Sequence, residues 1–172
     1  ESSTDTSAVA DGDDEVAEER ADAMERLGPD LKRQLKRVLA DDQNDLQDSV
    51  RRGGKDASVK DLPTAERQVA RFADALESPF RSAANAGATA VNARIWPGLV
   101  DGLVAETAHR LVDDVRTVVV EAVGANGGQD AALEAIRSHY RNVRTNHLGP
   151  LVDASLAKAF NLGVEHGNDS GR

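Results

Sequence analysis

The four histidines of the chain, His109, His139, His147 and His166, are the side chains best suited to metal binding or proton transfer near neutral pH. His139 and His147 are eight residues apart, so on one helix they lie on the same side but about 12 Å apart along the axis. That separation is too large for one shared metal ion, and no HExxH pattern is present. Glu165-His166 could exchange protons, but it lies close to a polar chain end. We therefore expect no metal, no cofactor and no catalytic residue.

Basic residues form two clusters whose spacing could bind an anionic partner. Arg137, Arg141 and Arg144 lie at i, i+4 and i+7, which places them on one ridge of a helix beside Tyr140. Their guanidinium groups could bind phosphate, an acidic peptide or the acidic start of this chain. The alternative is that these arginines simply form a solvent-exposed helix face without a partner. A second cluster, with the same two interpretations, consists of Lys32, Arg33, Lys36 and Arg37. Both clusters, together with Tyr140, form the candidate interaction surface.

The acidic residues are concentrated at the start of the chain. The first 25 residues hold ten acidic residues and one basic residue, a surplus equal to the net charge of -9 of the whole chain. The remainder is electrically balanced, which argues against nucleic-acid binding. No GxxxxGK, GxGxxG or GxSxG pattern is present. We expect a protein partner or self-association.

Composition favours one helical domain. The 172 residues suffice for one core, and its apolar content comes mainly from Ala, Val and Leu. The chain has no cysteine, which suits a reducing compartment, and the cytoplasm is expected. No apolar run approaches the roughly 20 residues of a membrane span. Because the sequence begins with Glu1, we expect a piece of a longer protein.

Apolar periodicity and helix-breaking residues then predict the order of the helices along the chain. Residues 1–12 are expected to be disordered, and a short weak helix follows from Asp13 until Gly28 and Pro29 end it. A second helix runs from Pro29 to Gly53-Gly54. Its apolar stripe contains Leu35, Leu39 and Leu46, but Asp42 occupies the place where the stripe should continue. This interruption argues against a long coiled coil.

The later elements are also expected to be helical. A third helix is capped by Asp61 or its neighbour, kinks at Pro79 and continues into the small residues 83–90, which should pack closely on a buried neighbour. After Trp96-Pro97-Gly98, residues 99–123 form the most hydrophobic helix, although 116–120 are β-branched enough to allow a strand. A helix of residues 133–148 ends at Gly149-Pro150. The last helix covers 151–164.

The chain contains the stretches LKRQLKRVLADDQNDL at 31–46 and AKAFNLGV at 157–164. These two stretches resemble the C-terminal helical regions of actinobacterial DivIVA-domain proteins, which are scaffolds of cell division and polar growth. The resemblance implies a helical scaffold in a bacterial protein and brings no catalytic residues. The membrane-binding coiled coil that defines that family has no counterpart here, so no residue is assigned to membrane targeting.

These observations predict an all-α bundle of four or five helices covering residues 28–166. Residues 1–27 form an acidic, mostly disordered arm with a short helix, and 167–172 form a frayed tail. The expected function is a non-catalytic interaction or scaffolding module of a larger bacterial protein. One alternative is a helical enzyme with a site around His139, Tyr140, Arg141 and Arg144. Another is a phage-type structural component, because an AFN-x-G stretch ends an Ala-rich helical region.

Overall fold

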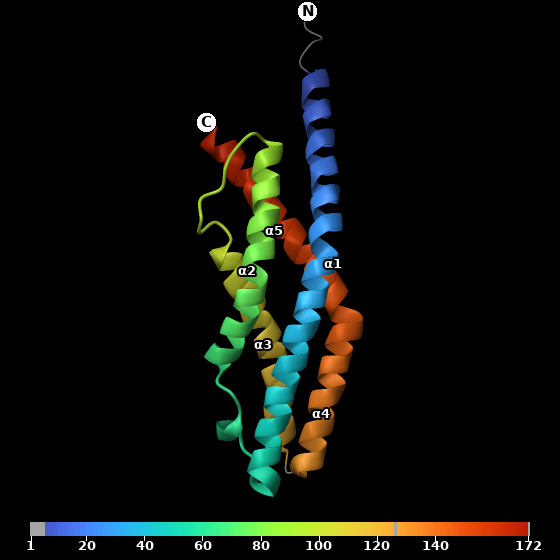
Figure 1. Cartoon of the computed structure of the whole chain (residues 1–172), viewed down its shortest axis with the longest axis vertical. Coiled ribbons are helices and arrows are strands. Elements are labelled where there is room, and N and C mark those ends of the chain that lie inside the picture. The colour runs from blue at the N-terminus through green and yellow to red at the C-terminus, as the bar shows by residue number, and fades with distance from the viewer. Residues whose placement is uncertain (1–5, 126, 172) are drawn as a thin grey trace, which may run out of the picture.

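A computed structural model describes residues 6–125 and 127–171 of the chain. Five α-helices form a bundle, with no strand among the described residues, which confirms the all-α prediction. The longest helix, α1, extends past the end of the bundle with its N-terminal turns (Figure 1). The helices are α1 (Thr6–Gly53), α2 (Ala65–Ala90), α3 (Asp101–Gly124), α4 (Gly128–Asn142) and α5 (Leu148–Ser170).

Helix α1 is continuous through Gly28 and Pro29, so the predicted break there is wrong. A proline inside a helix costs about 3 kcal/mol, because it lacks an N–H and its ring crowds the preceding turn. Tertiary burial on both sides offsets this cost: Ala23 and Leu31 are buried, and Leu27 packs on the core. The helix also includes residues 6–12, for which disorder was expected. Residues 1–5 lie outside the described residues.

The connections differ in detail from the prediction. Thr64, and not Asp61, caps α2, because its hydroxyl accepts a hydrogen bond from the Arg67 backbone N–H. Asp61 instead accepts hydrogen bonds from Ser58 in a short 3₁₀ turn, Val59–Asp61. Helix α2 continues through Pro79 to Ala90. The segment 116–120 is helical within α3, so the alternative of a strand there is wrong.

Gly149-Pro150 does not end a helix, contrary to prediction. Helix α4 passes through one π-helical turn, Val143–His147, directly into α5, and Gly149 and Pro150 lie in the first turn of α5. Helix α5 continues to Ser170, past the predicted domain end at residue 166.

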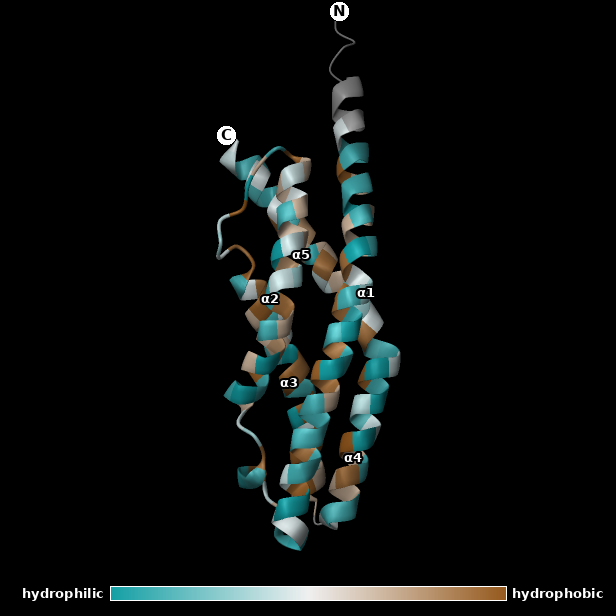
Figure 2. Cartoon of the chain, viewed as in Figure 1, coloured by the Kyte–Doolittle hydropathy of each residue, from teal (hydrophilic) through white to brown (hydrophobic). Residues whose placement is uncertain are grey.

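The core is built from Leu, Val and Ala side chains with Phe72, Phe80 and Phe160. Apolar residues lie mainly on the sides of the helices that face one another, whereas the start of α1 is mostly hydrophilic (Figure 2). The small residues of 83–90 pack against α5, which confirms the expected buried neighbour. Gly87 and Gly163 lie at this crossing, where a Cβ on Gly163 would be 1.8 Å from the Ala84 carbonyl oxygen.

No helix among the described residues has the length and apolar character needed to cross a membrane.

Candidate functional site

A buried carboxylate, Asp42, connects α1 to two other helices. It is fully buried and lies in the apolar stripe of α1. The Tyr140 hydroxyl of α4 donates a hydrogen bond to its Oδ2, and Gln68 Nε2 of α2 lies 3.1 and 3.2 Å from its two oxygens. Tyr140 is therefore buried in the bundle, which corrects its predicted place on the interaction surface. Asp42, interrupting the stripe, was the sequence signal for this network.

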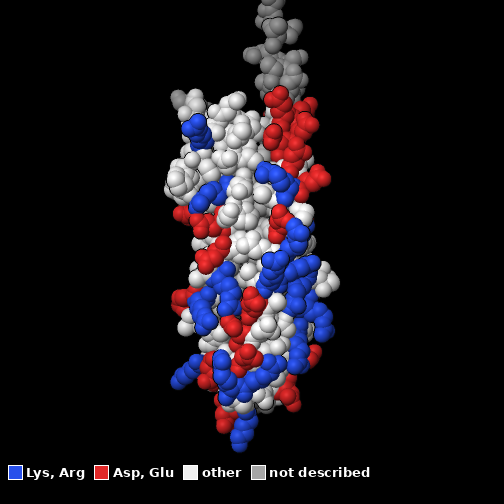
Figure 3. All heavy atoms as spheres, in the orientation of Figure 1, with Lys and Arg blue, Asp and Glu red and all other residues white. Residues whose placement is uncertain are grey.

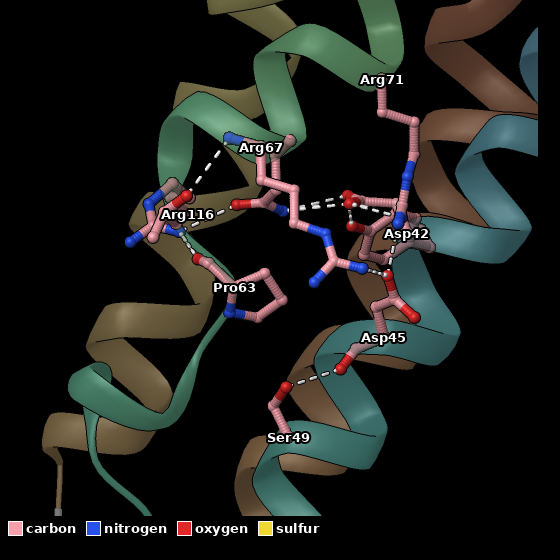
Figure 4. Close-up of polar contacts among 10 residues, drawn as sticks. Asp42, Asp45, Ser49, Pro63, Arg67, Arg71 and Arg116 are labelled. Atoms are coloured by element: carbon pink, nitrogen blue, oxygen red, sulfur yellow. Dashed lines mark hydrogen bonds and ion pairs between the residues drawn. The ribbon is translucent and has the colours of Figure 1, made fainter.

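Arginines extend the network to the bundle surface (Figure 4). Arg71 of α2 lies 3.3 Å from Asp42 and also pairs with Asp45. Arg116 of α3 donates hydrogen bonds to Gln68 Oε1 at 2.8 Å and to the Pro63 carbonyl at 2.7 Å. Four helices thus share one polar network, and sequence spacing could not have shown which arginines join it.

Burial dominates the electrostatics of this network. Loss of water around Asp42 raises the pKa of its carboxyl, although the hydrogen bonds from Tyr140 and Gln68 and the charge of Arg71 oppose that shift. Burial also raises the pKa of Tyr140, and the neighbouring Asp42 charge raises it further. The phenol therefore stays protonated and donates to Asp42 well above the pH at which a free tyrosine ionises.

Tyr140 is the one tyrosine of the chain, which makes its ionisation directly observable. Because its pKa is raised on folding, the stabilisation it provides is complete below about pH 10 and is lost as the pH rises above that value. We expect tyrosinate absorbance to rise only together with the loss of helical circular dichroism. The Tyr140→Phe variant should show no such absorbance. Ionisation near pH 10 in a still helical protein would contradict the burial of this side chain.

The three arginines of the predicted ridge line one groove, with Gln43 and Gln47 of α1 and Thr145. This basic groove has a volume of about 470 Å³ and no acidic residue in its lining. Among the described residues, no carboxylate lies within ion-pair distance of Arg141 or Arg144, and Arg137 pairs only with exposed Glu134 at 3.6 Å. Arg144 donates to Gln43 Oε1, while its Nε is buried without a hydrogen-bond partner.

The second predicted cluster, on α1, does not form one site. Lys32 pairs with Asp153 of α5 at 3.1 Å, and Arg33 pairs with Asp30 on its own helix. Lys36 and Arg37 are exposed and have no ion pair among the described residues. Lys36 precedes Gln43 by seven residues, about two helical turns, so it lies on the same side of α1 as the groove but nearer the N-terminus.

The histidines lie apart from the basic groove. His147 lines a different groove of about 490 Å³, together with Asp114 and Arg110 of α3. Burial lowers the pKa of half-buried His139, although nearby Asp114 opposes the shift. The enzyme alternative named His139, Tyr140, Arg141 and Arg144. The two arginines share the basic groove, whereas Tyr140 is buried in the core and His139 does not line that groove. Among the described residues, no three His, Asp or Glu side chains are placed to hold a metal ion.

No family model, curated protein or solved structure matches the chain. The resemblance to DivIVA-domain proteins therefore remains a prediction.

Proposed function

We propose that this chain is a non-catalytic helical binding module and that its basic groove binds an acidic helix or peptide of a protein partner. The observation that carries this proposal is the composition of the groove. Three arginines and Thr145 from one side and two glutamines of α1 from the other line the groove, with no acidic residue in the lining. Guanidinium groups form strong, paired hydrogen bonds with carboxylates, so a row of acidic side chains suits this lining.

The scaffold around the groove supports the same proposal. Gln43 and Gln47 follow Asp42 on α1, and Arg137, Arg141 and Arg144 lie before and after Tyr140 on α4 and on the π-helical turn that follows it. Because Tyr140 is hydrogen-bonded to Asp42 inside the bundle, the two walls of the groove are held in one register. Preorganised walls lower the conformational cost of binding.

The test is binding of a fluorescent helical peptide with four glutamates at i, i+3, i+4 and i+7. We expect the Arg141→Glu variant to bind at least about tenfold more weakly, because one cation becomes a repelling anion. Arg94→Glu is the matched control, since Arg94 is exposed in the loop between α2 and α3. Equal loss of affinity in both variants would contradict a site at the groove. Equally tight binding of duplex DNA would overturn the choice of a protein ligand.

A further inference from the structure

The N-terminal half of α1 carries the chemical complement of the basic groove. Its residues 12–25, called here the acidic segment, contain seven acidic residues and one arginine. Most of these side chains are exposed, and none has an ion pair among the described residues. Figure 3 shows Asp and Glu gathered over this part of α1, whereas Lys and Arg gather over the middle of α1 and over α4.

The acidic segment cannot reach the groove of its own chain. Both lie along one continuous helix, with Glu19 in the acidic segment and Gln43 in the groove wall. At 1.5 Å per residue the two positions are about 36 Å apart. The sequence-based idea that the acidic arm docks on its own arginines therefore conflicts with a continuous α1. The acidic segment of a second copy of the chain is not held at this distance, so it can reach the groove.

The charged side chains of the two surfaces have matching spacing. Arg137, Arg141 and Arg144 lie at i, i+4 and i+7, and Glu15, Glu18 or Glu19, and Asp22 lie at i, i+3 or i+4, and i+7. Arg137 and Arg141 lie on α4 and Arg144 lies in the π-helical turn that follows, whereas the acidic row lies on α1. The acidic row spans about 10.5 Å along its helix. An α-helix laid along the groove could therefore place one carboxylate near each guanidinium group.

We propose that the acidic segment of one copy binds in the basic groove of a second copy. This inference rests on the proposed function and names the partner as the chain itself. The contact is electrostatic and peripheral, so it is weak, reversible and sensitive to salt.

The test is a charge exchange between two variants of the full chain, followed by light scattering on a sizing column. The groove variant is Arg137→Glu with Arg141→Glu, both at exposed positions, and the segment variant is Glu15→Lys with Glu18→Lys and Asp22→Lys. We expect the unmodified chain to associate as its concentration rises in about 50 mM salt and to dissociate in about 500 mM. Each variant alone should be a monomer. Their equimolar mixture should associate again, because a complementary pair of surfaces is restored.

Circular dichroism first establishes that both variants are as helical as the unmodified chain. If the reversed segment variant loses helix, Glu15→Gln with Glu18→Gln and Asp22→Asn provides a neutral version, which should also be monomeric. An unmodified chain that stays monomeric at low salt overturns the inference. So does a mixture of folded variants that fails to associate. If the chain is monomeric but still binds the acidic peptide through Arg141, self-association is wrong and the proposed function stands.

Discussion

Replacing Gly163 with alanine is expected to lower the free energy of unfolding by about 3 kcal/mol. The added Cβ would lie 1.8 Å from the carbonyl oxygen of Ala84 and 2.7 Å from its carbon. These are backbone atoms of a helix, which cannot rotate away as a side chain can. Helices α2 and α5 must separate to admit the methyl group, and the neighbouring small residues then lose contact.

Urea unfolding followed by circular dichroism measures this effect. Gly87→Ala should behave alike, because its Cβ would lie 2.0 Å from the Phe160 carbonyl oxygen. Gly102→Ala is the matched control on α3, with no atom within 4 Å of the added Cβ. Alanine is a better helix former than glycine, so this control should gain up to about 1 kcal/mol. A Gly163→Ala protein as stable as the control would show that α2 and α5 do not cross so closely.

The helical fold was predictable because apolar and small residues recur with helical spacing. Leu35, Leu39 and Leu46 are buried as their stripe indicates. The small residues 83–90 indicated a close neighbour, but not which helix it would be, because each helix sequence describes only its own face. That neighbour, α5, is identified only by the three-dimensional packing at Gly87 and Gly163.

The predicted breaks at Gly28-Pro29 and Gly149-Pro150 were wrong for a common reason. A proline or glycine indicates only the local free-energy cost of continuing a helix. Whether the helix continues depends also on the apolar side chains that the turns on both sides bury in the core. Leu27 and Leu31 pack on the core on either side of Pro29. Leu148, directly before Gly149, is buried as well. Local preference was therefore outweighed by tertiary contacts that the sequence does not display.

The candidate site was predictable in part. The spacing of Arg137, Arg141 and Arg144 predicted one shared face, and these three residues do line one groove. Its other wall, Gln43 and Gln47, carries no charge and gave no signal. The spacing also placed Tyr140 beside the ridge, although successive helix positions turn by about 100°. That rotation is what directs its phenol into the core toward Asp42.

Removing the Asp42 carboxylate should be the most damaging single change in the polar network. In Asp42→Ala, the Tyr140 hydroxyl loses its acceptor and Gln68 Nε2 loses both of its own, inside the bundle. Breaking a buried charged contact in this way costs about 3–5 kcal/mol. Arg71 keeps its ion pair with Asp45, so the loss of stability should lie near the lower end of this range. Asp48→Ala is the control on the same helix, because Asp48 is exposed and pairs only with Arg51. The free energy of unfolding of this control should change by no more than about 0.5 kcal/mol.

A third variant separates the cost of unpaired polar groups from the value of the network itself. In Asp42→Leu with Gln68→Leu and Tyr140→Phe, no polar side chain remains unpaired at the centre, and Arg116 keeps the Pro63 carbonyl. Replacing a buried charged network by apolar groups is often neutral or stabilising, so urea unfolding should show most of the stability recovered.

The unmodified network fits only one register of α1, because sliding α1 by one turn, about 5.4 Å, moves Asp42 away from Tyr140 and Gln68. The apolar variant lacks this restriction, so its amide protons near residue 42 should exchange faster at equal global stability. Unchanged exchange there would show that packing alone fixes the register.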